Sequence, residues 1–568
     1  MAKPSVPLFP DRASGPAIQL GNDTTSSSPV PSMTEEISDQ TASTNRLRPY
    51  QSLYTKSWST QFGQPYTAGL TKNRLLLWST ITFALGLVAA LYLARVEDTR
   101  PSSQVSCLAS NNIPFVVEGS HGWEQKTVPW NPRLKYTPSA VATPQTADQI
   151  KAIVSCGIRN GVRVSAKSGG HSFGSFGFGG EDGHLVIALD QLNAVTVHTD
   201  GTARIQPGAR LGHVATELYK QGKRAIPLGT CPRVGIAGFI LHGGYGMAAR
   251  AYGLTLDWLI GATVILANGT SVHCSATENA DLFWAVRGAG SSFGIVAEFE
   301  LKTFEAPESV TPFAIDVFWG QTQAVEGFGI FQDLAMTAPR ALNAWLAISG
   351  TGQRIQGVWM GDLAGLNDTL RPLLGRLGVK LSYASTMSWI EAHEYFADGE
   401  ELEPASPYNL DERLYATSLM VHAITESQIE AFMSAVFAHM NDTSGHHSWS
   451  FEIAFHGGTS SAIADIDPST TAYAHRDKLL LYQFFGVGTP SQYPDDGFAV
   501  LQRFRDSITN TLADGDWGMY PNYIDTQLDV DTAQKLYWGK NLLRLRSIKA
   551  DLDPRQVFWN PHGVRPLL

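Results

Sequence analysis

The chain has 568 residues, which leaves room for two or three domains, and 43% of them are hydrophobic, 10% aromatic and 17% charged. This is the composition of a globular protein that can bury a large core. The formal charge of -10 includes no long run of like charge, so a surface that binds nucleic acid is not expected.

The N-terminal part divides into two segments. Residues 1–74 are rich in Ser, Thr, Pro, Gln and Asn and have little apolar periodicity, so we predict that they are disordered. The run 75–94 has no charge and is long enough to cross the roughly 30 Å hydrocarbon layer as a helix. We predict a single-pass membrane anchor there, with a buried core helix as the alternative. Lys72 and Arg74 precede the run, which favours a lumenal or extracellular catalytic part.

The four cysteines show no CxxC spacing, so neither a zinc site nor a redox motif is predicted. They could all be buried thiols. We predict a Cys107–Cys156 disulfide, because the predicted topology places the domain in an oxidising compartment. In that compartment three sequons could carry N-glycans, at Asn268, Asn367 and Asn441.

An α+β fold is indicated by the order of the predicted elements. From about 135 to 305 short β-rich runs alternate with helical ones, and from 306 to 515 longer segments suggest a second α+β layer. A helix is expected again over 533–550. The helices predicted in the first part span 146–160 and 211–220, and its strands span 162–165, 185–189, 203–205, 258–266 and 294–302.

Three glycine-rich runs are the most distinctive local features. The run SGGHSFGSFGFGG begins at Ser168 and follows a predicted strand, so its backbone could approach a ligand closely. The second run, Leu228–Gly246, contains Cys231. The third, Arg287–Gly294, precedes a strand, so it fails the context of a dinucleotide-binding fingerprint. Each run alone could be a flexible surface loop.

Together these runs resemble the berberine bridge enzyme family of FAD-linked oxidases, in particular its fungal branch with the glucooligosaccharide oxidases. The resemblance implies an FAD-binding domain of the PCMH type over 105–305, completed by 516–568. It also implies a substrate domain over 306–515, whose antiparallel sheet covers the flavin ring. The matching stretches are SAKSGGHSFGSFGFGGEDGHL, GTCPRVGIAGF, GLTLDWLIGATVILANG, ENADLFWAVRGAGSSFGIV, YPNYID and YWGKNLLRLRSIKADLDP.

The resemblance also implies how FAD is held. His171 would bond the 8α-methyl carbon of the flavin and Cys231 would bond its C6 atom, which tunes the potential of the ring. Val234 matches the position at which the family's oxidases admit oxygen, so O2 is the expected acceptor. The remaining residues expected around the cofactor are Ser168, Gly169, Gly170, Ser172, Gly235, Gly238, Ile295 and Val296.

For catalysis the resemblance implies hydride transfer to the flavin, with Tyr523 as the first choice of base, Tyr520 as the second and Gln483 as a substrate contact. A tyrosine in this role needs a lowered pKa. The run 451–458 is predicted to be a strand with Glu452, Ala454 and His456 on one face. Ala454 stands where sugar oxidases of this branch carry an acid.

That departure favours an apolar pocket and a specialised metabolite as substrate. Ala237, Phe239 and His242 depart from the family's usual Gly, His and Gly, and Phe173 replaces a tyrosine. We therefore expect an FAD-linked oxidase of a small organic molecule. The alternatives are a carbohydrate oxidase that yields a lactone and hydrogen peroxide, and a membrane-anchored binding protein on an inactive flavoenzyme scaffold.

Overall fold

The computed structural model describes residues 103–405, 413–440 and 448–567. The disordered region predicted over 1–74 and the membrane helix predicted over 75–94 lie outside these residues and stay predictions. Among the described residues, none of the helices combines the length and the apolar character needed to span a bilayer. Asn268 and Asn367 are exposed, as glycosylation would require, whereas Asn441 lies outside the described residues.

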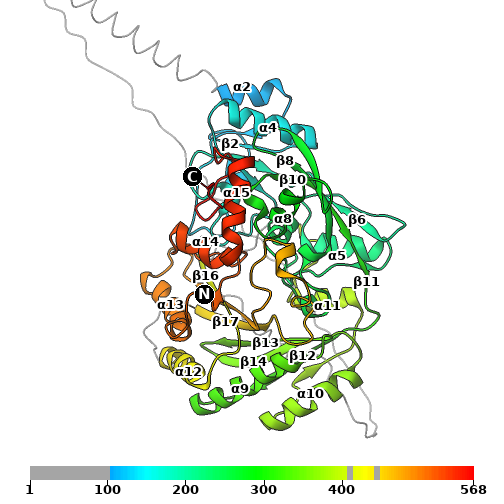
Figure 1. Ribbon diagram of the computed structural model, residues 1–568, viewed down its shortest axis with the longest axis vertical. Helices are drawn as coiled ribbons and strands as arrows, with labels where there is room; N and C mark the ends of the chain where they lie inside the picture. The colour runs from blue at the N-terminus through cyan, green and yellow to red at the C-terminus, as the bar shows by residue number, and fades with distance from the viewer. Residues whose placement is uncertain (1–102, 406–412, 441–447, 568) are drawn as a thin grey trace, which may run out of the picture. The chain divides into compact units, whose positions relative to one another are not determined.

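The upper lobe in Figure 1 is built mainly on two sheets, beside a two-stranded pair of β7, Arg224–Ala225, and β11, Phe304–Glu305. In the smaller one β2, β4 and β3 are parallel and β1 joins the edge antiparallel. The larger one is antiparallel, with the order β5-β6-β10-β8-β9. The bounds are β1 Phe115–Val116, β2 Ala140–Ala142, β3 Val164–Lys167, β4 Leu185–Ala188, β5 Val195–Val197, β6 Thr202–Ile205, β8 Leu259–Ile265, β9 Ser271–Ser275 and β10 Ile295–Lys302.

Helices cover both sheets. The predicted helices over 146–160 and 211–220 are α4, Ala147–Arg159, and α5, Leu211–Lys220. Thr146 caps α4 by accepting a hydrogen bond from the Gln149 amide, which satisfies one of the free N–H groups at the helix start. The predicted Cys107–Cys156 disulfide is confirmed. It joins α2, Ser103–Ser110, to α4 with Cα atoms 5.8 Å apart.

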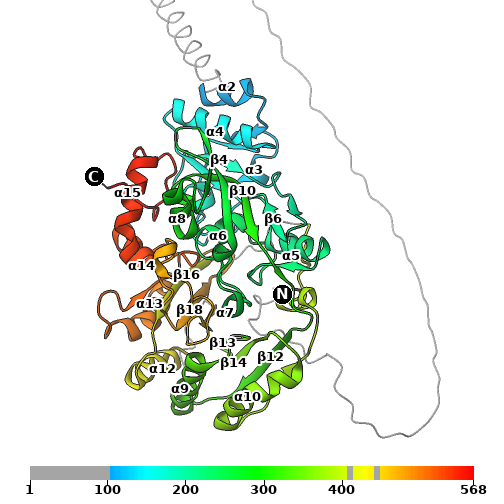
Figure 2. The ribbon, with the colours of Figure 1, turned by 45° about the vertical axis from the view of Figure 1, so that its right-hand side comes forward.

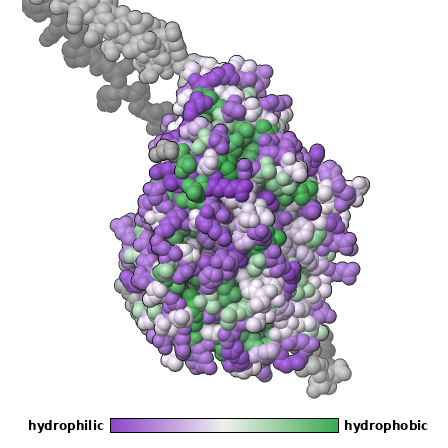
Figure 3. All heavy atoms as spheres, in the orientation of Figure 1, coloured by the Kyte–Doolittle hydropathy of each residue, from purple (hydrophilic) through white to green (hydrophobic). Residues whose placement is uncertain are grey.

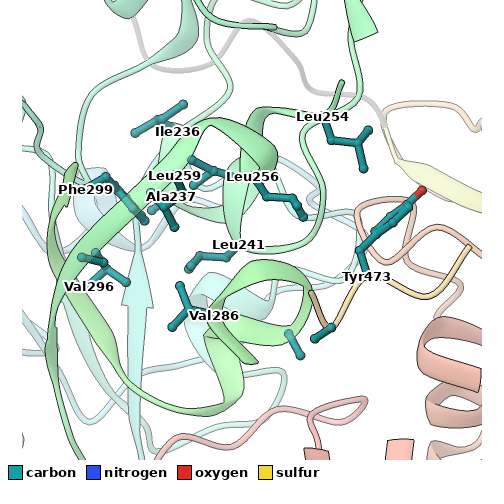
Figure 4. Packing of buried hydrophobic residues seen from close by; sticks show 14 of the residues in the cluster. Ile236, Ala237, Leu241, Leu254, Leu256, Leu259, Val286, Val296, Phe299 and Tyr473 are labelled. Atoms are coloured by element: carbon teal, nitrogen blue, oxygen red, sulfur yellow. The ribbon is translucent and has the colours of Figure 1, made fainter. Parts of the chain in front are cut away.

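The core below the cavity floor is shown in Figure 4. Ile236, Ala237 and Leu241 of the short helix α6, Ile236–Leu241, are buried between Val286 of α8, Ala280–Ala289, and Val296 of β10. Ala237 and Leu241 also line the cavity, so α6 connects the core of the upper lobe to the cavity wall.

The lower lobe is one antiparallel sheet of eight strands in the order β15-β12-β14-β13-β17-β18-β16-β19. The helices α9, α10, α12 and α13 pack on one face of it (Figures 1 and 2). Its strands are β12 Thr311–Val317, β13 Leu342–Ser349, β14 Gly352–Trp359, β15 Tyr383–Ala384, β16 Leu414–Val421, β17 Ser448–Phe455, β18 Leu480–Val487 and β19 Trp517–Gly518, and its helices are α9 Gln321–Thr337, α10 Leu363–Leu377, α12 Glu426–Met440 and α13 Asp495–Thr509.

The C-terminal segment returns to the upper lobe, where its helices lie beside α8 in both ribbon views. The single helix predicted over 533–550 is wrong in one respect. It is broken at Gly539, which has a φ of +43°, into α14, Val530–Trp538, and α15, Leu542–Leu552. Trp538 donates a hydrogen bond to the Gly288 carbonyl at 3.0 Å.

The outer surface is mostly hydrophilic on the face that Figure 3 shows, with scattered hydrophobic residues between. The most exposed large apolar side chains, Phe318 and Leu543, belong to different lobes. The fold is α+β, as predicted, with its large antiparallel sheet in the second half of the chain.

Candidate active site

A cavity of about 710 Å³ opens between the two lobes and brings together all the site residues proposed from the sequence. The upper lobe supplies one wall and the uncovered face of the eight-stranded sheet supplies the other. The structure tests where these side chains lie, and their individual roles stay predictions. The proposed residues on the lining are Ser168, Gly169, Gly170, His171, Ser172, Cys231, Val234, Gly235, Gly238, Ile295, Val296, Gln483, Tyr520 and Tyr523.

Two glycine runs meet in the upper wall because neither has a side chain at the crossing. A Cβ atom on Gly169 would lie 2.2 Å from the Gly235 nitrogen, and one on Gly235 would lie 2.0 Å from the Gly169 nitrogen. Gly238 differs, since a Cβ there would meet no protein atom within 4 Å and would point into open space. The runs therefore form a backbone cradle with room for a large ligand.

His171 and Cys231 belong to different loops of this cradle. The His171 ring stacks on Trp130 with centroids 4.9 Å apart, and Phe173 meets Trp130 edge-on at 5.2 Å. The Cys231 thiol is accessible from the cavity. The protein around it still removes most of its contact with water, and this desolvation raises its pKa. Cys274, the other free cysteine in the described chain, is buried in the core.

Polar groups of the upper wall suit a phosphate-bearing, hydroxyl-rich ligand such as FAD. Lys167 lines the cavity, and burial lowers its pKa to about 8 while nearby Asp190 opposes the shift. Its ammonium group could face a pyrophosphate. His562 donates from Nε2 to the Leu528 carbonyl at 3.2 Å, and burial lowers its pKa. Its Nδ1 atom is therefore an acceptor, and it is buried without a partner in the described residues.

The lower wall follows from the period of two along a strand. Phe451, Ile453 and Phe455 of β17 face the helices, whereas the residues between them face the cavity. Glu452 pairs directly with Gln483 of β18, and Ala454 pairs with Trp345 of β13 and Leu481 of β18. The further cavity residues on this face, which sequence reasoning did not select, are Asn343, Trp345, Gln356, Leu481 and Phe485.

His456 departs from the predicted arrangement. It follows the last residue of β17, is fully buried, and its Nε2 atom lies 2.9 Å from the Tyr473 hydroxyl. It is not part of the cavity wall. The expectation that His456 shares a face with Glu452 and Ala454 is therefore wrong, because the strand ends before it.

The two candidate tyrosines have different surroundings. The Tyr520 oxygen accepts hydrogen bonds from the Gly244 amide at 2.9 Å, the Tyr245 amide at 3.0 Å and Asn522 Nδ2 at 3.0 Å. Gly243 and Gly244, with φ of +142° and +83°, form the turn that aims those amides. Tyr520 therefore ties the C-terminal segment to the glycine run.

Tyr523 lines the cavity, and no hydrogen bond engages its hydroxyl within the described chain. The prediction of a lowered tyrosine pKa is wrong for this chain on its own. Burial raises the pKa of Tyr523 well above its ordinary value, and the nearby Tyr520 and Glu452 raise it further. Burial also raises the pKa of Tyr520, although its three donors oppose the shift.

Glu452 stands out in the sequence only as a neighbour of Ala454, yet it is the carboxyl group on the lower wall nearest to Gln483. Burial raises its pKa from an ordinary 4.5 to about 7. Sequence analysis does not identify Trp130 as a site residue. Its contact with His171 joins residues far apart in the sequence, and no motif around Trp130 predicts that contact.

The comparisons with known proteins agree with this geometry. The "FAD binding domain" family model matches residues 138–275, and the "Berberine and berberine like" model matches 519–565. The chitooligosaccharide oxidase of Gibberella zeae is 45% identical over 493 residues, which cover 86% of this chain and 99% of that protein. The chain belongs to the berberine bridge enzyme-like family of FAD-linked oxidases. It is thus an FAD-dependent oxidase with the PCMH-type fold, in the branch of the fungal oligosaccharide oxidases.

Two further family members are informative about the substrate class and the cofactor. The FAD-linked oxidoreductase dpmaF of Metarhizium anisopliae is 47% identical and covers 84% of this chain and 94% of its own. A solved structure of the Acremonium strictum glucooligosaccharide oxidase is 42% identical, with a TM-score of 0.79, and covers 82% of this chain and 100% of its own. That enzyme holds a 6-S-cysteinyl, 8α-N1-histidyl FAD.

Proposed function

We propose that this family member is an oligosaccharide oxidase, which converts an alcohol carbon of a sugar to a lactone and reduces O2 to hydrogen peroxide. The observation that carries the proposal is the sheet face opposite the glycine cradle. Its amides Gln356 and Gln483 can both donate to and accept from sugar hydroxyls, and Trp345 offers an apolar ring face. The similarity to chito- and glucooligosaccharide oxidases supports the same substrate class.

This proposal replaces the specialised metabolite as the first choice of substrate. That expectation rests on an apolar pocket, but amides and a carboxyl group line the lower wall, and tyrosines of the C-terminal segment line the same cavity. A specialised metabolite stays the second candidate, because Ala454 leaves the acid position vacant and because dpmaF, an FAD-linked oxidoreductase, is as similar as the sugar oxidases. The inactive-scaffold alternative is not supported, since the chain is a member of an oxidase family.

We further propose that His171 and Cys231 both bond the flavin. The two side chains line one cavity from separate loops, and the glucooligosaccharide oxidase structure has one histidyl and one cysteinyl link. Bound there, FAD would supply a hydride acceptor, whose reduced form would pass the two electrons on to O2. Lys167 and His562 would hold its polar parts, and Val234 would lie on the path of O2 at the ring.

The first test uses purified full-length protein with its flavin. Cello-, xylo- and chitooligosaccharides, and a panel of non-sugar alcohols, are each supplied as donors while peroxide and lactone are measured. We expect peroxide and lactone from at least one oligosaccharide series. If only non-sugar alcohols bleach the flavin under anaerobic conditions, the second candidate replaces the first.

The second test addresses the links. After acid denaturation, yellow colour and flavin mass should stay with the polypeptide, and peptide mapping should find them on His171 and Cys231. His171→Ala and Cys231→Ala should each leave a single link. A wild-type protein whose flavin is wholly released by acid would contradict the proposal.

A further inference from the structure

Glu452 is a carboxyl group without a partner on the wall of a cavity. It projects from β17 toward the same space as Gln483 and Tyr523. Within the described residues it makes neither a hydrogen bond nor an ion pair. The side chain is half-buried and faces the cavity, and a carboxyl group that is shielded from bulk water normally has a hydrogen-bond partner. Its position therefore points to a partner that the protein does not supply.

The groups that face Glu452 from neighbouring elements are uncharged. Gln483 stands beside it on β18 and Ala347 on β13. Tyr523 and Tyr245 are near enough for the carboxylate charge to raise the pKa of both phenols. Their own ionisation is thereby disfavoured, and no phenolate competes with Glu452 for the role of the anion in this part of the cavity.

Other charged groups on this side are engaged or stand farther away. Arg354 lies on the same sheet face, two strands from Glu452, and Asp316 holds it with Nε and Oδ1 2.7 Å apart. Asp398, after α11, Trp389–Phe396, also lines the cavity and has an interaction of its own. Neither group shifts the pKa of Glu452, whose rise comes from burial alone.

We propose that Glu452 is a catalytic base of this enzyme, which accepts the hydroxyl proton of the bound alcohol. The inference rests on the proposed function, since it requires an alcohol as substrate. In the step, the O–H bond of the alcohol breaks and its proton passes to the Glu452 carboxylate. The C–H bond breaks at the same carbon, its hydride goes to FAD, and a C=O bond forms. O2 then takes the two electrons and two protons as hydrogen peroxide.

The surroundings suit this task. An unpartnered carboxylate can accept a proton without first giving up another hydrogen bond, and Gln483 can hold the same hydroxyl in place. Burial raises the pKa of Glu452 to about 7, close to the pH at which a base transfers protons best. Tyr523, with its free hydroxyl and raised pKa, would then orient the substrate as a neutral hydrogen-bonding group.

The experiment compares Glu452→Gln with the wild-type holoprotein, using any oligosaccharide that the donor panel identifies. The variant keeps the shape of the side chain and removes the base. We expect the anaerobic rate constant of flavin reduction to fall about 100-fold or more. The acid limb of the wild-type pH profile, expected near pH 7, should vanish, while the flavin content and spectrum stay unchanged.

Two further variants sharpen the result. Ala454→Asp in the Glu452→Gln background restores a carboxylate two residues along the same strand face, so part of the lost rate should return. Glu426→Gln, an exposed residue at the start of α12, is the matched control and should change neither the rate nor the pH profile. A folding defect would show in the flavin spectrum of the variant and not in its pH limb.

A readout that does not depend on turnover completes the test. The infrared carbonyl band of a protonated carboxylic acid should disappear from the wild-type holoprotein as the pH rises through 7, and it should be absent from Glu452→Gln. Unchanged reduction kinetics and pH limb in Glu452→Gln would overturn the inference. So would a raised KM at an unchanged reduction rate, which would make Glu452 only a binding group. A donor panel without any reactive oligosaccharide would instead contradict the proposed function.

Discussion

The two walls of the cavity are built on different principles. In the upper wall, glycines such as Gly169 and Gly235 let one backbone touch another, and the shape of the cradle depends on missing side chains. In the lower wall, strands place side chains such as Glu452 and Gln483 next to each other, and the chemistry depends on which side chains they are. The comparison teaches that the cofactor wall tolerates little change, whereas the substrate wall can change its chemistry one residue at a time.

The largest expected effect is the loss of stability when a side chain is added where the two glycine runs of the upper wall cross. Gly169→Ala would place a Cβ atom 2.2 Å from a backbone nitrogen, so we expect a loss of about 3 kcal/mol or more in the free energy of unfolding, or no folded protein. Gly238→Ala should fold normally, because its Cβ meets no protein atom within 4 Å, but it should carry less flavin. Chemical denaturation and flavin content measure both. Equal stability of the two variants would refute the close-contact argument.

The next effect concerns the disulfide that joins α2 to α4 in the upper lobe. The Cys107–Cys156 disulfide closes a loop with a sequence separation of 49 residues, so removing it should cost up to about 4 kcal/mol. Denaturant unfolding of Cys156→Ser measures the loss. Adding Cys107→Ser should cost little more, because the bond is already gone. Additive losses from the two substitutions would argue against the bond.

A smaller effect sharpens the account of the lower wall through pH. The folded-state pKa of Glu452, about 7, lies above the ordinary 4.5, so the folded state keeps a proton that the unfolded state has lost. Stability from this group is present below pH 4.5, falls as the pH rises to 7 and stays lost above it. Glu452→Gln should therefore gain up to about 3 kcal/mol relative to wild type between pH 5 and pH 8. A pH-independent difference in Tm would be inconsistent with a buried, protonated carboxyl group.

The smallest stability effect separates the tyrosines that join the two walls. Tyr520→Phe leaves the Gly244 and Tyr245 amides without their acceptor, so we expect a loss of about 1–3 kcal/mol. Tyr523→Phe removes no protein hydrogen bond and should leave the stability nearly unchanged while it weakens substrate reduction. Thermal unfolding and stopped-flow flavin reduction distinguish the two. The opposite pattern would exchange their roles.

Prediction from the sequence succeeds where the local pattern carries the information. The helix over 211–220 is predicted at its observed bounds, and His171 and Cys231, which the family resemblance selects, both lie on the cavity. Prediction fails where a contact between distant segments decides. Gly539 splits a helix that looks continuous, and the Tyr pKa values rise because the cavity offers burial without a nearby cation.

The sequence by itself indicated the family by resemblance, the α+β fold class and which residues line the upper wall, because the family's motifs and the apolar periodicity are local patterns of the sequence. Only the tertiary structure decided the lower wall. The pairing of β17 with β13 and β18 puts Glu452 beside Gln483 and near Tyr523, while Trp130 reaches His171 from outside every recognisable run. Such neighbours are chosen by strand register and lobe packing, which depend on contacts across hundreds of residues and leave no local signature.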